Sequence, residues 1–529
     1  MGDHKQEHKK ISAGCLAVLA AASLMPLRVT VAQQPFPLLG PDEMPAATAC
    51  SALGELELSE LSGITAAWNR AGPSPIAELG NDGEARELAA HCRVQGRIEP
   101  SIGFEVWLPA AEDWNGRFVA VGGAGTAGNI SYQRMAPMLD QGYATASTDT
   151  GHTAGDWEWM SDESLLRDFS YRAIYEMTAK SNAVVRSFYQ RPASFRYFNG
   201  CSLGGRQGLV EAQRFPRDYD GIVAGAPVNA YIDTRMTQIW AMQVAQPGSP
   251  GQTLLDEAAL DLVAATATAQ CDTLDGVADG VLEDPRRCNF DPGRLQCGVA
   301  APGRCLSSAQ VEAVRQMYRG PRLPVTGQIA PGFPVGSEAG WSFASAAEPP
   351  VISLQFLRRV IFDDPLWTWR RFDLESDVAL AREQAGWLMD ATSPELGNFR
   401  DQGGKLLLYH GWNDSNNSAL ATITYYEAIE NELATRPNPL SIATPEFARL
   451  FLVPGMGHCA GGIGTSQFDA QRAIENWVER GIAPDRIEAE RVDAEGTVIR
   501  TRPLCPYPQT ARYRGTGNSD RSGSFVCSQ

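Results

Sequence analysis

Short apolar runs that end in glycine-rich or polar turns form the strongest pattern in this sequence. Residues 118–121, 143–147 and 195–198 each end in such a turn, and a helical stretch at 206–214 follows the last of them. Strands that alternate with helices in this way favour a mostly parallel sheet. The chain is therefore predicted to belong to the α/β class, with helices on both faces of the sheet.

The same pattern divides the chain into segments. With 529 residues, of which 43% are hydrophobic, the sequence is too long for one simple core and too apolar for a disordered chain. The alternation stops near Asn229 and resumes with a strand at 405–409; a last strand is expected at 449–453 and a last helix at 467–480. We therefore expect two core segments, 33–228 and 396–529, with an inserted domain at 229–395 between them.

The N-terminal residues have the layout of a secretory leader. Three lysines precede an apolar run at 11–27, and Thr30-Val31-Ala32 then offers a small-residue cleavage site. Residues 1–32 are predicted to be a signal peptide cut after Ala32, which makes the protein secreted or periplasmic. A retained anchor is the alternative, because the apolar run is close to the shortest membrane span. No later segment resembles a transmembrane helix, so no stable membrane anchor is expected after cleavage.

The cysteine count agrees with export. Removal of the leader takes Cys15 away from the 11 cysteines and leaves an even number, which indicates up to five disulfides in an oxidising compartment. Spacing alone suggests three local pairs, which are Cys271 with Cys288, Cys297 with Cys305, and Cys505 with Cys527.

The charge balance excludes one class of partner. The chain has 45 basic and 62 acidic residues and a formal charge of −17. Such a surface repels polyanions, so nucleic acid is not an expected partner. The oligomeric state does not follow from the sequence.

One motif indicates nucleophilic catalysis. Gly200-Cys201-Ser202-Leu203-Gly204 is a G-x-S-x-G sequence between an expected strand and an expected helix. This context is that of the nucleophile elbow of α/β-hydrolases, in which glycines permit a sharp turn that exposes the serine hydroxyl. An ordinary glycine turn is the alternative. Ser202 is therefore the predicted nucleophile.

Chain order selects the partners of Ser202. Without the leader the chain has four histidines, His91, His152, His410 and His458. The fold places its acid and then its base after the serine, which favours Asp414 as the acid and His458 as the base. Asp414 could instead cap a helix, and His458 could be a loop histidine of no catalytic role. His410 is interpreted as structural or pocket-lining, and His152 as cleft-lining or structural.

Acyl transfer also needs donors for the developing oxyanion. The amide that follows the nucleophile belongs to Leu203. The second donor is expected from the glycine-rich turn at 122–125, where Gly125 is our choice; a plain turn is the alternative. Cys201 immediately precedes the predicted nucleophile, and Cys459 immediately follows the predicted base. A disulfide between them would tie the two loops together.

These residues resemble the tannase and feruloyl esterase family. The similarity rests on Cys201-Ser202, Asp414 and His458-Cys459 and extends over essentially the whole chain after the leader. It implies an α/β-hydrolase core with a large lid, and a serine carboxylesterase that acts on esters of aromatic acids. It also implies disulfides between Cys50 and Cys92 and between Cys201 and Cys459, besides the three local pairs. His410 and Asn417 are possible pocket residues, and at Asn417 this sequence departs from an aromatic residue of a terephthalate-ester hydrolase in the family.

A calcium ion is implied as well. Residues 271–281 carry three aspartates among glycines, which can surround a hard cation, although the spacing is not that of an EF-hand. An acidic turn is an equally good interpretation of the residues alone. The resemblance implies structural Ca²⁺ held by the carboxylates of Asp272, Asp275 and Asp279 and the carbonyls of Val277 and Val281.

Together these features predict a secreted serine carboxylesterase with a small aromatic ester as its substrate. A feruloyl ester, another phenolic ester and a hydroxyethyl-terephthaloyl ester are all compatible with them. Two alternatives remain open at this point. One is a tannase that hydrolyses galloyl esters, and the other is a catalytically silent, calcium-dependent extracellular binding protein.

Overall fold

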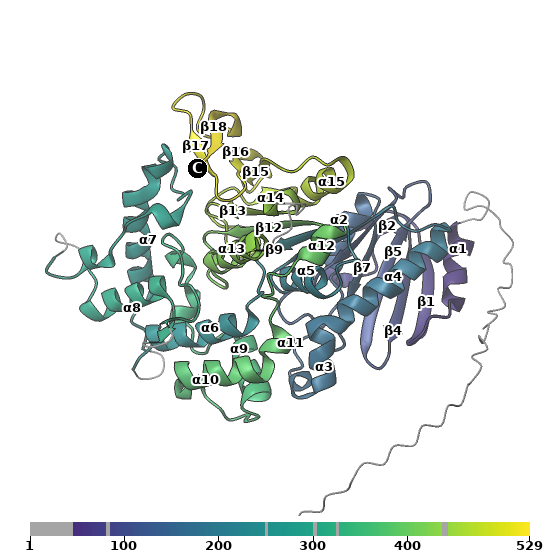
Figure 1. Ribbon diagram of the computed structural model, residues 1–529, viewed down its shortest axis with the longest axis horizontal. Coiled ribbons are helices and arrows are strands. Elements are labelled where there is room, and N and C mark those ends of the chain that lie inside the picture. The colour runs from purple at the N-terminus through teal and green to yellow at the C-terminus, as the bar shows by residue number, and fades with distance from the viewer. Residues whose placement is uncertain (1–45, 81–84, 249–251, 300–303, 324–326, 436–442) are drawn as a thin grey trace, which may run out of the picture. The chain divides into compact units, whose positions relative to one another are not determined.

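The structure is a computed structural model that describes residues 46–80, 85–248, 252–299, 304–323, 327–435 and 443–529 (Figure 1). The predicted leader, residues 1–32, lies outside these ranges. None of the helices within them has the length and apolar character that a membrane crossing requires.

A nine-stranded sheet forms the centre of the fold. Its strands, in spatial order, are β1 (Leu61–Asn69), β4 (His91–Ile98), β5 (Ile102–Pro109), β7 (Ala144–Thr148), β6 (Arg117–Val121), β8 (Phe195–Cys201), β9 (Gly221–Gly225), β12 (Lys405–Gly411) and β13 (Ala448–Val453). From β7 to β13 every neighbouring pair is parallel. The prediction of a mostly parallel sheet is therefore confirmed.

Helices cover both faces of this sheet. Side chains of β6 alternate between the faces, so that Phe118 and Ala120 pack with α4 (Ala173–Tyr189), α5 (Leu203–Arg214) and α13 (Ala419–Thr435). Val119 packs on the opposite side in a cluster with α15 (Ala470–Arg480), and α2 (Tyr132–Asp140) also lies on that side, against Val121. This arrangement, with its central parallel strands, is that of an α/β-hydrolase.

The sequence did not predict the antiparallel edge. Strands β1, β4 and β5 precede Arg117 and pair antiparallel with one another, and β5 pairs antiparallel with β7. The last helix also differs from its prediction. It begins at Ala470, because the Asp469 side chain accepts from the amide of Arg472 at its N-terminus. Residues 467–468 form β14 (Gln467–Phe468) and pair with β15 (Ile487–Val492).

No strand of the large sheet comes from the chain between β9 and β12 within the described ranges. The helices of this segment are α6 (Tyr231–Ala245), α7 (Glu257–Cys271), α8 (Ser308–Arg319), α9 (Val351–Phe356), α10 (Leu374–Ala381), α11 (Trp387–Met389) and α12 (Gly397–Asp401). Most of them share an apolar cluster in which Trp341 and Phe356 are fully buried. The division into core and lid domains at residues 229 and 395 stays a prediction.

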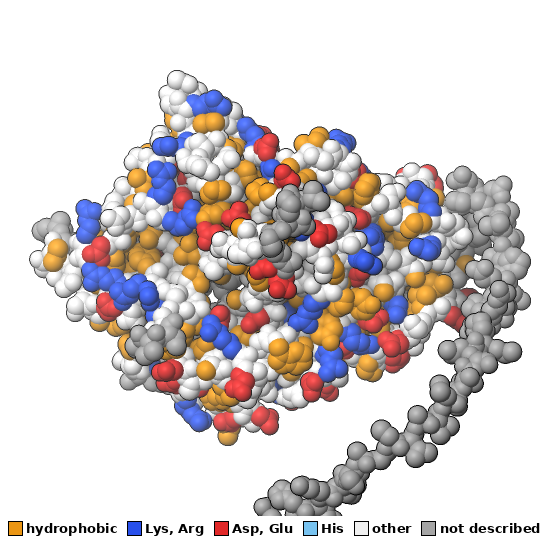
Figure 2. Space-filling view, viewed as in Figure 1, with side chains coloured by type: hydrophobic (Ala, Val, Ile, Leu, Met, Phe, Trp, Pro, Cys, Tyr) orange, Lys and Arg blue, Asp and Glu red, His pale blue; other side chains and the backbone are white. Residues whose placement is uncertain are grey.

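The remaining elements are small. They are α1 (Ala46–Ala52), β2 (Gly72–Pro73), β3 (Glu87–Leu88), α3 (Glu163–Arg167), β10 (Arg322–Leu323), β11 (Gly327–Gln328), α14 (Thr444–Phe447), β16 (Val498–Leu504), β17 (Thr510–Tyr513) and β18 (Phe525–Ser528). Five disulfides join Cys50 to Cys92, Cys201 to Cys459, Cys271 to Cys288, Cys297 to Cys305 and Cys505 to Cys527. They agree with the pairs suggested by spacing and implied by the resemblance. Figure 2 shows basic and acidic side chains interspersed over the face in view.

Candidate active site

Ser202 occupies a sharp turn between β8 and α5. Its backbone has φ 64° and ψ −120°, a conformation that is costly for a residue with a side chain. The turn is held by its amide, which donates to the carbonyl of Gly225 at 2.9 Å. Gly200 must lack a side chain, because a Cβ there would lie 2.5 Å from the backbone of Gly204. The sequence around Ser202 thus folds as a nucleophile elbow.

Strands β8, β9, β12 and β13 are consecutive in the sheet and end at the same level, which brings the predicted triad together. Cys201 of β8 and Tyr409 of β12 both pair with Gly225 of β9. Ser202 follows β8, Asp414 follows β12, and His458 follows β13. Residues 44 and 256 positions apart in the chain thereby come within hydrogen-bond distance of one another.

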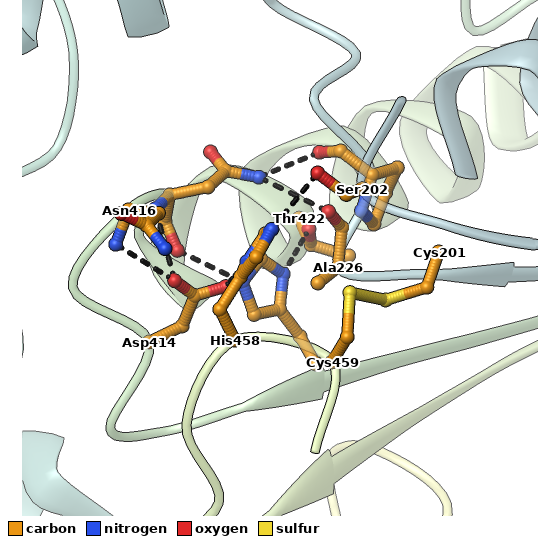
Figure 3. The surroundings of a disulfide bond; sticks show 11 residues. Cys201, Ser202, Ala226, Asp414, Asn416, Thr422, His458 and Cys459 are labelled. Carbon is orange, nitrogen blue, oxygen red and sulfur yellow. Dashed lines mark hydrogen bonds and ion pairs between the residues drawn. A yellow bond between two sulfur atoms is a disulfide. The ribbon is translucent and has the colours of Figure 1, made fainter. Parts of the chain in front are cut away.

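The three side chains form a continuous hydrogen-bonded chain (Figure 3). His458 Nε2 lies 2.8 Å from Ser202 Oγ, and His458 Nδ1 lies 2.6 Å from Asp414 Oδ2. Because an ionised carboxylate only accepts, Nδ1 carries the proton and Nε2 is free to accept from the serine hydroxyl. This geometry is that of a serine nucleophile with its general base and an orienting acid.

Asp414 is fully buried and takes part in more than one set of hydrogen bonds. Its Oδ1 accepts from the amides of Asn416 and Asn417 at 2.8 and 3.1 Å. The carboxylate therefore closes a turn, but it is not the cap of the following helix α13, which begins at Ala419. Its Oδ2 accepts from His458 and also from His410 Nε2 at 3.1 Å. Burial opposes its ionisation, but the hydrogen bonds that it accepts from the two histidines hold the pKa of Asp414 well below its usual range.

His410 agrees with its structural interpretation, but its contact with Asp414 was not predicted. It is fully buried on β12, and its Nδ1 lies 2.7 Å from the hydroxyl of Thr422. Since the partners of Nε2 are both acceptors, Nε2 carries the proton, and Nδ1 accepts from Thr422. His410 is not among the described residues that line the cavity at Ser202. It therefore fixes the carboxylate of Asp414 by a hydrogen bond and does not face the cavity.

The two predicted oxyanion donors lie beside the nucleophile. Gly125 and Leu203 both line the cavity that contains Ser202. In the part of the chain that the structure describes, neither backbone amide donates to another protein group. Both N–H groups are therefore available to a ligand, although their roles as oxyanion donors stay a prediction.

His152 supports the loop that carries Gly125. Its Nε2 donates to the carbonyl of Thr126 at 2.8 Å, and its ring stacks on Trp159 with centroids 4.1 Å apart. Burial lowers the pKa of His152, which favours the neutral ring. The structural interpretation of His152 is thus the appropriate one. Across the site, the disulfide between Cys201 and Cys459 links the elbow to the loop of the histidine base (Figure 3).

A cavity of about 390 Å³ opens onto Ser202 and His458. Asn417 lines it, in agreement with its prediction as a pocket residue. Tyr231, Arg235 and Gln238 also line it, and sequence reasoning did not find them. One signal was present, because these three residues recur at i, i+4 and i+7 and so share one face of α6.

The predicted calcium loop has suitable oxygen atoms, but they are engaged with the protein. Asp272 Oδ1 accepts from two backbone amides, while Asp279 Oδ2 pairs with Arg500 and Arg502. Burial, together with the charges of neighbouring carboxylates, raises the pKa of Asp275 to about 6. Within the described ranges, no three acidic, histidine or cysteine side chains are placed so as to hold a metal ion together. Carboxylate and carbonyl oxygens suit Ca²⁺, but in this structure the carboxylate of Asp279 is paired with arginines and is not placed to bind the ion.

The chain is similar to known esterases over most of its length. Residues 86–528 match the model of the family described as tannase and feruloyl esterase. An uncharacterised esterase of Xanthomonas campestris is 38% identical over 83% of this chain and 84% of its own. The mono(2-hydroxyethyl) terephthalate hydrolase of Piscinibacter sakaiensis is 34% identical over 87% of each chain.

A solved structure has the same fold. The crystal structure of feruloyl esterase B from Aspergillus oryzae superposes with a TM-score of 0.83 at 27% identity. The superposition covers 92% of this chain and 100% of that structure. The similarity therefore includes the segment between β9 and β12 as well as the large sheet.

Proposed function

Since the chain belongs to the tannase and feruloyl esterase family and is a carboxylic ester hydrolase, we propose that it hydrolyses esters of aromatic carboxylic acids through an acyl-enzyme on Ser202. The observation that carries this proposal is the continuous hydrogen-bonded chain from Ser202 Oγ through His458 to Asp414 Oδ2. The similar proteins include a mono(2-hydroxyethyl) terephthalate hydrolase and a feruloyl esterase, which supports an aromatic acyl group.

The residues divide the reaction as follows. His458 Nε2 takes the proton of Ser202 as its Oγ attacks the ester carbonyl, and returns that proton to the leaving alcohol. Asp414 fixes the tautomer and stabilises the charged ring. The amides of Gly125 and Leu203 hold the negative oxygen of the tetrahedral intermediate. Water activated by His458 then attacks the acyl-enzyme and releases the acid.

The test is a comparison of feruloyl, galloyl, hydroxyethyl-terephthaloyl and simple acetyl esters in one kinetic assay. We expect aromatic esters to have the larger kcat/KM, and Ser202→Ala to lower kcat by roughly 10⁴-fold or more. Equal rates in wild type and Ser202→Ala would rule out the serine mechanism. A clear preference for acetates would rule out the aromatic acyl group, and a preference for galloyl esters would identify the tannase alternative.

The structural calcium ion is part of the proposal. Asp272, Asp275 and Asp279 would supply carboxylate oxygens, and Val277 and Val281 would supply carbonyls, once Asp279 turns away from Arg502. Support comes from Asp275, whose pKa is raised by burial and neighbouring negative charge, a state that a bound cation would relieve. When bound, the ion would neutralise the charge of the carboxylates and order the loop.

Export from the cytoplasm is also proposed. Five disulfides support an oxidising compartment. The mature protein should begin at Gln33, which N-terminal sequencing of protein recovered from the periplasm or medium would test. A mature N-terminus that retains the apolar run would instead identify a membrane anchor.

A further inference from the structure

Two arginines enter the cavity that contains Ser202. Arg235 comes from α6 and is only 6% exposed, and Arg134 comes from α2 and is half-buried. The described residues that line this cavity include no aspartate or glutamate. The catalytic cavity therefore has two positive charges and no fixed negative charge, in a chain whose formal charge is −17.

Neither guanidinium has a partner among the described residues. Arg235 Nε is buried without any hydrogen-bond acceptor, and the guanidinium carbon lies 4.9 Å from the centroid of the Tyr231 ring. Arg134 likewise forms no hydrogen bond or ion pair within the part of the chain that is described. Burial without a counter-ion lowers the pKa of both residues. The hydration that each charged group loses is therefore not replaced by a protein partner.

Arg206 shows what a structural arginine looks like in the same region. It is as deeply buried as Arg235, yet it donates to the carbonyls of Met389, Ser170 and Leu388. Its hydrogen bonds tie α5 to the chain that returns from the insert. Arg235 has no such acceptors, so packing and hydrogen bonding do not account for its position. An unpaired buried donor in a ligand cavity is explained when the ligand supplies the acceptor.

We propose that this cavity selects esters that carry a free carboxylate, with Arg235 as the residue that binds it and Arg134 as a second positive charge. The inference rests on the proposed esterase function and narrows its substrate class. A guanidinium fits a carboxylate through two parallel hydrogen bonds, and a water-excluded cavity strengthens that pair. The carboxylate can belong to the acyl part, as in a monoester of a dicarboxylic acid, or to the alcohol part, as in an ester of a hydroxy acid.

The experiment compares each anionic ester with a neutral partner of the same shape. Methyl hydrogen terephthalate and methyl 4-carbamoylbenzoate test the acyl side; feruloyl quinate and its quinate methyl ester test the alcohol side. For wild type we expect kcat/KM for the acid to exceed that for its neutral partner at least tenfold in one pair, which identifies the side. Arg235→Gln should lower that ratio at least tenfold, and Arg235→Lys should preserve part of it.

Arg371→Gln is the matched control, because Arg371 is exposed on the insert and does not line the cavity. It should keep the wild-type ratio. Wild-type ratios of one or less in both pairs contradict the proposal whatever the variants do, and so does an unchanged ratio in a folded Arg235→Gln protein.

A binding measurement separates this inference from the proposed function. Calorimetry should detect terephthalate binding to Ser202→Ala, with an affinity that falls at least tenfold when Arg235→Gln is added. If no ester is hydrolysed, the esterase proposal fails, and terephthalate binding alone decides the anion site. If neutral esters are hydrolysed as well as acids and terephthalate does not bind, the anion site fails and the esterase stands.

Discussion

Asp414 accepts hydrogen bonds from two histidines, and only one of them faces the nucleophile. The G-x-S-x-G motif predicted Ser202, and chain order with the scarcity of histidines then predicted Asp414 and His458. The same reasoning gave His410 no definite role, because its contact with Asp414 depends on how the turn after β12 folds back onto that strand. Arg235 was missed for a similar reason, since a helix periodicity does not reveal which face meets a cavity.

The role of His410 can be tested by removing its donor. We expect His410→Leu to lower kcat about tenfold, roughly 1.4 kcal/mol, with a small change in KM. A carboxylate with one fewer donor attracts the protonated ring of His458 more strongly, so the acid limb of the pH–kcat profile should move to higher pH. His410→Gln, whose amide can still donate, should retain more activity. An unmoved acid limb in His410→Leu would show that His410 only fills space.

At the scale of elements, parallel strands explain how the site is assembled. β8, β12 and β13 end at one edge of the sheet, and their glycine-rich exits were visible in the sequence. The antiparallel strands β1, β4 and β5 were not predicted. β1 is an edge strand with no fully buried residue, so its hydrophobic signal is weak, and strand order depends on contacts between distant segments. The pairing of β7 with β5 places Asp149, in the turn after β7, beside Gly103 of β5.

Asp149 gives a prediction for stability against pH. Its Oδ1 accepts from the amides of Gly103 and Gly151, but burial raises its pKa from 3.8 to about 6. Between these values the folded chain keeps a proton that the unfolded chain has lost, so the stability contributed by this group falls from about pH 4 to about pH 6 and stays at the lower level above that. Asp149→Asn keeps the acceptor and should raise the free energy of unfolding at pH 8, by about 3 kcal/mol at most, and Tm should rise with it. Thermal melts at pH 4 should show little difference, and an equal gain at both pH values would contradict this account.

At the scale of the whole molecule, the formal charge predicts that no polyanion is a partner but says nothing about the cavity. The two arginines at Ser202 lie in a chain of net charge −17, so the local and global charges have opposite signs. The predicted calcium loop joins distant parts of the chain, because it packs against the C-terminal strands. Asp279 of that loop pairs with Arg502 of β16.

Calcium should therefore affect stability more than catalysis. We expect EDTA to lower Tm by several degrees and added Ca²⁺ to restore it, with calorimetry showing one site per chain. Asp275→Ala should abolish the response to Ca²⁺, while Asp261→Ala, which changes an exposed carboxylate of α7 outside the loop, should keep it. A Tm that is identical in EDTA and in Ca²⁺ would remove the metal from this account.

The central claim is that Ser202 is an activated nucleophile, and labelling with a fluorophosphonate tests it most directly. Such reagents phosphonylate serines that a neighbouring base activates. Mass spectrometry should find one label per chain on the peptide that contains Ser202, esterase activity should fall in proportion to labelling, and Ser202→Ala should take up none. A label on another residue, or full activity in a fully labelled protein, would contradict the account.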